Sequence, residues 1–250
     1  MTAGSPDRHE GLRRAIAAAS PGTTAPDKPT IRFVADLVCP WCYIAFRRLR
    51  RLLVEAPTGL IWHPFLLNPH LPAGGVSRTL YLERKFGSLA QAHIVHRRMT
   101  QAGTGAGIAF AFGAIRMQPN TVAAHALLLS VAEQDRQLEL AEMLFGAFFS
   151  SGANLGDEAF LRSMAARVGI GATACNAALA ATSRERIARY HGQAYDSGIS
   201  GVPVSVFGED HVIAGAQPVE ALAALLDLER YRCGGSPMAA LTAATAHSPR

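Results

Sequence analysis

Two cysteines separated by two residues, Cys39 and Cys42, form the segment Cys-Pro-Trp-Cys and are the strongest chemical signal in the sequence. Thiols at this spacing can form and break a disulfide with each other, so the pair predicts thiol–disulfide exchange. The segment follows an apolar run at residues 31–35 and precedes a helical pattern that begins near Pro40. Proline is favoured at the first position of a helix, where its missing N–H has no partner to lose. Cys39 then lies at the positive end of the helix dipole, which favours its thiolate form.

The two thiols are predicted to have different roles. Cys39, at the start of the helix, is expected to be the attacking thiolate and to be open to solvent. Cys42 lies one turn further along the same face and is expected to be more buried, so it would resolve the mixed disulfide. Asp36, three residues before Cys39, is a candidate proton acceptor for Cys42. Its alternative role is to cap the turn between strand and helix.

A zinc site is the main alternative for this pair of cysteines. Structural zinc needs four ligands, usually from a second pair, whereas Cys175 and Cys233 each stand alone. His93 and His96 could supply a pair, but they belong to a polar helical pattern. A purely structural disulfide is also disfavoured, because so short a loop constrains little chain entropy. Redox chemistry is therefore the favoured interpretation, and no metal or cofactor is expected.

Length and composition describe a globular protein. The 250 residues allow one large domain or a domain with an insertion, and 49% hydrophobic residues are ample for a core. The net charge of +5 comes from arginine, since Lys28 and Lys85 are the only lysines. Such a bias can reflect genome base composition, so no nucleic-acid partner is expected. The basic run at residues 47–51 is interpreted as a solvated helix face, with attraction of acidic thiols such as glutathione as the alternative.

Neither a membrane partner nor a secretory signal is expected. No stretch approaches the roughly 20 consecutive apolar residues of a membrane span, and the apolar run at residues 15–19 is too weak for a signal peptide. Four cysteines in 250 residues suit a reducing compartment. The sequence therefore predicts a cytoplasmic protein. The oligomeric state is left open, with a homodimer as one option.

The elements around the cysteines form a pattern of their own. Strands at residues 31–35 and 60–67 flank a helix at 40–55, which predicts parallel neighbours with a right-handed crossover. Strands at 202–207 and 211–214 form a hairpin signal, and an amphipathic helix follows from 217 or 218 to 228. Between these two parts, apolar residues recur at three- and four-residue spacing. The helices predicted there cover residues 79–86, 89–102, 121–133, 138–149, 157–168 and 173–196, with Asp157 as a cap.

This order predicts an α/β protein with a thioredoxin-like fold and a large all-helical insertion. The expected boundaries are a flexible leader at 1–29, a thioredoxin-like domain in two halves at 30–75 and 197–230, an inserted helical domain at 76–196 and a flexible tail at 231–250. Thioredoxin-like proteins place a cis-proline before the third core strand, opposite the thiols, and Pro203 occupies the matching position. An ordinary trans proline at the entry of a strand is the alternative.

Taken together, the motifs resemble those of the DsbA-like disulfide oxidoreductases, and most closely their FrnE-like branch. The similarity is collinear from about residue 31 to residue 228. The matching segments are Asp36 to Ile44 with Arg47-Arg48, Trp62 to Pro69, Lys85-Phe86-Gly87, Asn120 with Ala124-His125, Gly152 to Leu155, and Gly198 to Pro203 with Gly215-Ala216-Gln217.

The resemblance implies a protein-disulfide oxidoreductase or isomerase with Cys39 and Cys42 as the redox pair. Trp41, Val202 and Pro203 would bind the substrate, which docks as a short strand through main-chain hydrogen bonds. The implied partners are a protein or a small molecule that carries a thiol or a disulfide, with glutathione as a potential co-substrate. Two alternatives stay open. One is a glutathione-dependent isomerase or transferase of the related kappa-type fold, like 2-hydroxychromene-2-carboxylate isomerase. The other is a non-enzymatic redox-sensing module that binds a partner. His125 and Trp62 are interpreted as core or groove wall.

Overall fold

A four-stranded sheet forms the centre of the fold. The structure, a computed structural model, describes residues 29–56, 58–208 and 211–232. The strands are β1 (Thr30–Ala35), β2 (Gly59–Pro64), β5 (Val204–Phe207) and β6 (His211–Ala214), in the order β2-β1-β5-β6. Strand β1 is parallel to β2 and antiparallel to β5, and β5 is antiparallel to β6. The parallel pair and the hairpin confirm the thioredoxin-like fold that the sequence predicts.

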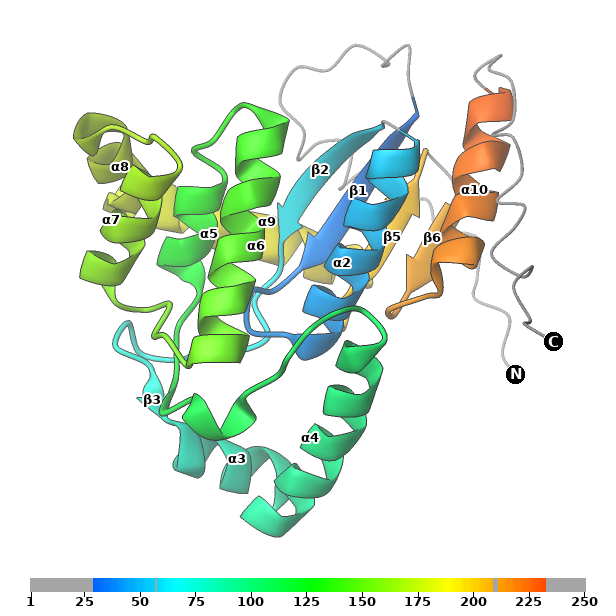
Figure 1. The fold of residues 1–250 in the computed structure, drawn as a ribbon. Coiled ribbons are helices and arrows are strands. Elements are labelled where there is room, and N and C mark those ends of the chain that lie inside the picture. Colours follow the sequence, from blue (N-terminus) through cyan, green and yellow to red (C-terminus); the bar gives the residue numbers. More distant parts are fainter. Residues whose placement is uncertain (1–28, 57, 209–210, 233–250) are drawn as a thin grey trace, which may run out of the picture.

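Helices cover both faces of this sheet (Figure 1). Helices α2 (Pro40–Glu55) and α10 (Val219–Arg232) lie on one face, where Phe33 of β1 stacks on Phe46 of α2 with ring centroids 6.3 Å apart. Helix α9 (Ala181–Asp196) lies on the other face, where Ala194 packs against Val34. Successive residues of a strand point to opposite faces, so β1 is apolar on both sides. The sheet is therefore buried between two helical layers.

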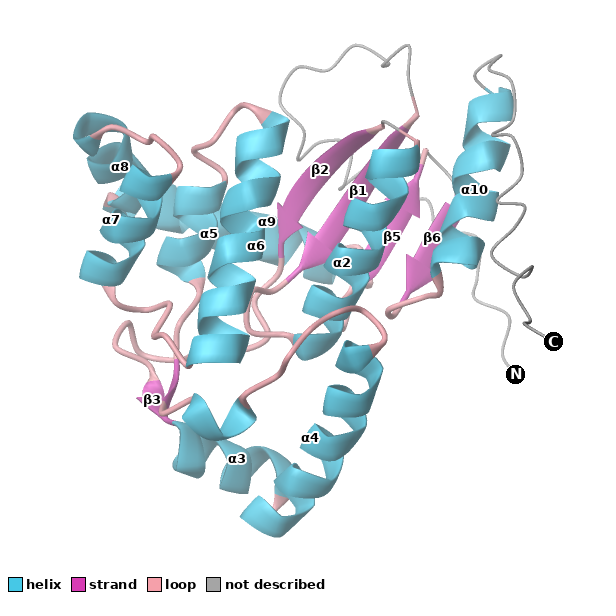
Figure 2. Cartoon of the chain, in the orientation of Figure 1, coloured by secondary structure: helices cyan, strands magenta, loops and turns pink. Residues whose placement is uncertain are grey.

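The segment between the two halves of the sheet is mostly helical (Figure 2). Helix α6 joins it to the sheet, because its Phe145 stacks on Tyr43 of α2 with centroids 4.9 Å apart. One continuous core therefore runs from the sheet into the helical part. The elements are β3 (Val76–Ser77), α3 (Arg78–Phe86), α4 (Leu89–Thr104), η1 (Phe112–Ala114), β4 (Met117–Gln118), α5 (Val122–Leu128), α6 (Gln134–Ser151), α7 (Glu158–Arg167) and α8 (Ala172–Leu179).

Three predictions for this segment are wrong in detail. It is not all-helical, because β3 and β4 pair as a short antiparallel ladder between residues distant in sequence. Helix α5 ends at Leu128 instead of Glu133, since the Gln137 side chain binds the carbonyl oxygens of Leu128 and Val131. The helix predicted over 173–196 is two helices that meet at Ala180, whose ψ of 160° is extended.

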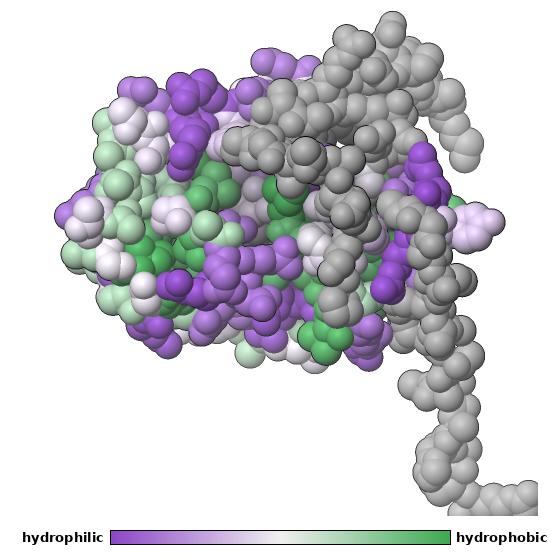
Figure 3. Space-filling model, turned by 90° about the horizontal axis from the view of Figure 1, so that it is seen from above, coloured by the Kyte–Doolittle hydropathy of each residue, from purple (hydrophilic) through white to green (hydrophobic). Residues whose placement is uncertain are grey.

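Packing explains the break at Ala180. Helix α8 contacts α5 and α7, whereas α9 contacts α5 and β2, so one straight helix could not reach both sets of neighbours. Neither glycine nor proline marks the position. Seen from above, the molecule presents a surface on which hydrophilic and hydrophobic residues are mixed (Figure 3). The predicted cap of α7 is confirmed, since Asp157 Oδ1 accepts from the Ala159 amide at 2.9 Å.

The two ends of the chain lie largely outside the described residues. The leader predicted for 1–29 is described only at Pro29. The predicted tail begins too early, because α10 continues through Tyr231 to Arg232, and Cys233 is not described. Within the described ranges, each helix is too short or too polar to cross a lipid bilayer.

Buried His63 predicts a loss of stability in mild acid. It is 5% exposed on β2, and burial lowers its pKa from the ordinary 6.5 to about 4. Between pH 6.5 and pH 4, His63 takes up a proton readily in the unfolded chain but not in the folded protein. Protonation therefore favours the unfolded state, and the free energy of unfolding should fall by about 3 kcal/mol as the pH is lowered from above 6.5 to about 4. Urea unfolding at pH 7 and pH 4 measures the loss, which His63→Asn should reduce and exposed His70→Asn should leave unchanged. Equal losses in both variants would contradict the assignment.

Candidate active site

Cys39 stands at the N-cap of α2, directly after the turn that follows β1. The turn is closed by a hydrogen bond from the Cys39 amide to the Asp36 carbonyl oxygen at 3.0 Å. Pro40 is the first helical residue, as predicted, and the Cys39 sulfur accepts from the Cys42 amide at 3.3 Å. An otherwise unpaired amide of the first helical turn therefore points at this sulfur, and such amides favour negative charge.

Cys42 is fully buried, more than its partner, as predicted. Burial raises the pKa of the Cys42 thiol well above its ordinary value, and the hydrogen bond with Cys39 raises it further. Cys42 therefore remains a thiol at neutral pH, and it must lose a proton before it can attack a disulfide. Both cysteines are free thiols in the structure.

Cys39 is covered more completely than the sequence predicts. Its exposed fraction is 4%, because the loop before β5 packs over it and the Val202 carbonyl oxygen lies 3.7 Å from its sulfur. The expectation of an open thiol is therefore wrong for the protein without a partner. Trp41, between the two cysteines, is 38% exposed and presents an aromatic surface beside them.

The loop that reaches Cys39 is the predicted proline segment. The Val202–Pro203 peptide bond is cis, as expected, and the Pro203 carbonyl oxygen accepts from the Gly215 amide at 2.8 Å. A cavity of about 410 Å³ is lined by residues 198–204 together with Val212, Ala214 and Gly215. The fold thus places Val202, which lines this cavity, against a sulfur 163 residues earlier in the chain.

Asp36 is completely buried beneath the turn. Its Oδ2 accepts from the Leu67 amide at 2.7 Å, and its Oδ1 lies 3.4 Å from the Val38 amide. The capping role considered for this residue is therefore present in the structure. Its charge also acts on the redox pair, because the negative carboxylate further raises the pKa of Cys42.

His125 and Trp62, interpreted from the sequence as core or groove wall, belong to the same site. Trp62 Nε1 donates to His125 Nδ1 at 3.2 Å, and His125 Nε2 lies 3.4 Å from Asp36 Oδ1. Nδ1 thus accepts the indole hydrogen, and Nε2 lies near the carboxylate without a hydrogen-bond partner among the described residues. The three side chains come from β2, α5 and the turn after β1. Their spacing in the sequence carries no signal of this contact.

The other candidate groups have separate surroundings. Two arginines of the basic run have partners in the fold: Arg47 pairs with Glu142 at 2.8 Å, and Arg48 donates to the Ala216 carbonyl oxygen at 2.7 Å. His93 and His96 lie on α4 with ring centroids 6.5 Å apart. Among the described residues, no three His, Cys, Asp or Glu side chains come together as a metal site. Cys175 is a buried thiol in α8.

Comparison with known proteins identifies what this arrangement is similar to. The family model of the DSBA-like thioredoxin domain matches residues 30–227. A comparison with curated protein sequences found no match. A solved probable DsbA oxidoreductase from Streptomyces coelicolor is 24% identical, with a TM-score of 0.71 and coverage of 80% of this chain and 89% of that one.

Two further solved structures share the fold at lower identity. A 2-hydroxychromene-2-carboxylate isomerase is 15% identical, with a TM-score of 0.63 and coverage of 82% of this chain and 98% of that one. The cytosolic disulfide reductase DsbM from Pseudomonas aeruginosa, in a structure with GSH, is 16% identical, with a TM-score of 0.51 and coverage of 74% and 89%. At these identities the likeness concerns the fold alone.

Proposed function

The chain belongs to the DSBA-like thioredoxin domain family, and from this membership and the geometry of its thiols we propose that it is a thiol–disulfide oxidoreductase or isomerase acting through Cys39 and Cys42. The observation that carries the proposal is the position of the Cys39 sulfur. It accepts an amide hydrogen at the start of α2 and lies 3.7 Å from the carbonyl oxygen of Val202, a residue that also lines the cavity of about 410 Å³. A substrate strand that pairs beside Val202 would bring its disulfide to this sulfur.

The exchange proceeds in two steps. The Cys39 thiolate attacks one sulfur of a substrate disulfide, so a mixed disulfide forms and the other substrate sulfur leaves as a thiolate that takes up a proton. Cys42 then loses its proton and attacks Cys39, which releases the second substrate thiolate and leaves a Cys39–Cys42 disulfide. The substrate gains two electrons and the protein loses two. Two molecules of a thiol of the glutathione class would return the two electrons: the first forms a mixed disulfide with Cys39 and frees Cys42, and the second attacks that mixed disulfide and leaves with the first as an oxidised disulfide.

The partner sites follow from the same geometry. Deprotonation of Cys39 removes the S–H···O contact to Val202, which frees that carbonyl oxygen for an incoming strand. Main-chain pairing beside Val202 and Pro203, with Trp41 as an apolar contact, suits substrates of many sequences. These three residues are the proposed substrate contacts.

Asp36 is the proposed proton acceptor for Cys42. A buried thiol with a raised pKa needs a base, and the charge of Asp36 acts on Cys42 inside the same core. His125 Nε2, 3.4 Å from Asp36 Oδ1, would help to hold the carboxylate in position. The presence of both cysteines supports disulfide exchange over the glutathione-dependent isomerase alternative. A redox-sensing module without enzymatic activity is distinguished from an enzyme by experiment.

Trapping of a mixed disulfide tests the proposal. In Cys42→Ser the first step is intact and the second lacks its nucleophile, so a Cys39-linked adduct with a disulfide-bearing peptide should accumulate and persist until dithiothreitol is added. Non-reducing gels and mass spectrometry detect the adduct. The double variant Cys39→Ser/Cys42→Ser is the matched control and should form none. A redox-sensing module would form the Cys39–Cys42 disulfide without turning over insulin, and that result would sink the enzymatic proposal.

A further inference from the structure

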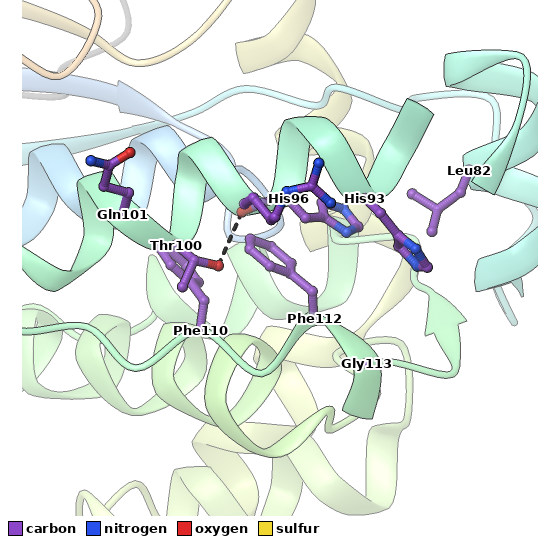
Figure 4. Close-up of a pocket in the computed structure, with 9 residues that line it drawn as sticks. Leu82, His93, His96, Thr100, Gln101, Phe110, Phe112 and Gly113 are labelled. Atoms are coloured by element: carbon purple, nitrogen blue, oxygen red, sulfur yellow. Dashed lines mark hydrogen bonds between the residues drawn. The ribbon is translucent and has the colours of Figure 1, made fainter. Parts of the chain in front are cut away.

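A second cavity, of about 640 Å³, opens on the helical part of the molecule between α4 and the segment around η1 (Figure 4). We term it the α4 pocket. Figure 4 shows His96 and Thr100 of α4 beside Phe110 and Phe112, whereas Gln101 lies apart from these rings. The lining side chains that carry the argument are His93, His96, Arg97 and Gln101 from α4 and Phe110 and Phe112 from the segment around η1.

One wall of the α4 pocket is a stack of flat rings. His96 lies parallel to Phe112, with centroids 4.2 Å apart and 7° between the planes. Phe112 in turn lies parallel to Phe110 at 4.9 Å and 13°. Phe110 meets the edge of Tyr43, the residue after Cys42, at 6.2 Å. Because these rings stack face to face on one another, a planar aromatic ligand beside them would meet their edges, and edge-to-face ring contacts add to the energy of burying area.

The polar groups of the pocket carry positive charge or none. None of the nine lining residues is acidic. Arg97 is exposed, and within the described part of the chain its guanidinium has neither an ion pair nor a hydrogen bond. In contrast, the arginines beside the smaller cavity of about 380 Å³ include Arg47 and Arg48, which are already bound by Glu142 and by Ala216. Arg97 is therefore ready for a ligand, and a guanidinium pairs well with a carboxylate.

His96 adds a neutral polar edge to the ring wall. It is 8% exposed, and burial lowers its pKa to about 4, so the imidazole is uncharged at neutral pH. Its backbone carbonyl oxygen accepts from Thr100 Oγ1 at 3.0 Å, whereas its ring nitrogens have no hydrogen-bond partner among the described residues. One ring nitrogen can donate to a ligand and the other can accept.

We propose that the α4 pocket binds a planar aromatic carboxylate, with its ring against Phe110, Phe112 and His96 and its carboxylate paired with Arg97. The proposal rests on the two walls of the pocket and is independent of the exchange reaction at Cys39. A carboxylate matches the free guanidinium, and a flat ring matches the stack. Gln101, also on α4, supplies a further amide donor at the polar side.

Three probes of one size separate the two parts of the proposal. Titration calorimetry on the full chain compares 2-naphthoate, the neutral 2-naphthamide and the saturated decahydro-2-naphthoate. The naphthoate should bind about fivefold more tightly than either analogue, since each lacks one of the two contacts. The carbon-bound ring protons of His96 should shift in NMR spectra on addition of the naphthoate. Equal binding of all three probes, no binding at millimolar naphthoate, or unchanged His96 signals would overturn the proposal.

Two neighbouring arginines give a matched pair of variants. Arg97→Gln should weaken naphthoate binding about fivefold and leave the amide unaffected. Arg98→Gln, which removes the same charge one position along α4 but outside the pocket lining, should leave both unaffected. Both side chains are exposed, so both variants should fold. An equal loss in the two variants would mean that only the general charge of α4 attracts the ligand, and the proposed pairing would be wrong.

Discussion

Cys39→Ser is expected to abolish insulin reduction, with a loss on the order of a thousandfold or more. The hydroxyl of serine does not ionise near neutral pH, so it cannot replace the thiolate that the amide of Cys42 stabilises. Cys42 could not compensate, because it is fully buried and its thiol has a raised pKa. Glutathione-coupled turnover of insulin, followed through NADPH consumption with glutathione reductase, measures the loss.

Cys175→Ala is the control for this experiment. Cys175 is also a buried free thiol, but it lies in α8, outside the site. Its replacement should leave turnover unchanged, and circular dichroism should show that both variants fold. Substantial insulin reduction by Cys39→Ser would assign the attack to another sulfur and would refute the roles given to the pair.

Asp36→Asn should slow the release of the mixed disulfide about a hundredfold at pH 7, the scale of a lost general base. The Cys42 thiol must then give its proton to solvent, and burial leaves few thiolates at this pH because the pKa is raised. The thiolate fraction grows tenfold with each pH unit below the pKa. The defect should therefore shrink steadily from pH 7 to pH 9. Stopped-flow measurement of product thiol after rapid formation of the adduct follows this step alone.

Two effects of Asp36→Asn have opposite signs, which makes the experiment decisive. Loss of the negative charge also lowers the pKa of Cys42 and by itself would speed the step. A rate that is unchanged or faster across pH 5 to 9 would show that Asp36 serves only as the cap bound by the Leu67 amide. Asp157→Asn is the control, because asparagine is an equally good cap for α7 and the residue is distant in the fold.

Local patterns explain which elements were predictable. Helix α2 begins at Pro40 and ends at Glu55, as expected, because a proline at the helix start and an apolar face are recognisable from neighbouring residues. No local sequence pattern indicates the break at Ala180 or the β3–β4 ladder. Both depend on which distant element a segment packs against or pairs with, so the period of the pattern alone could not reveal them.

The candidate site divides along the same line. The thiol pair, its helix and the proline of the β5 loop were predictable, because each is a short motif with its own local chemistry. The sequence could not predict that Val202 covers Cys39, nor that Asp36, His125 and Trp62 contact one another. Each of these contacts joins residues that are distant in the sequence. In the sequence, His125 could not be distinguished from an ordinary core residue, because its proximity to Asp36 arises only on folding.

The sequence by itself determined that two thiols stand at the start of a helix in a thioredoxin-like chain, because spacing and helix-start chemistry are local properties. Only the tertiary structure decided how deeply those thiols lie, which carboxylate is buried beneath their turn, which carbonyl oxygen faces Cys39, and where the α4 pocket forms. Burial and electrostatic contact depend on the whole packed core, and that core exists only once strands and helices from both ends of the chain have come together.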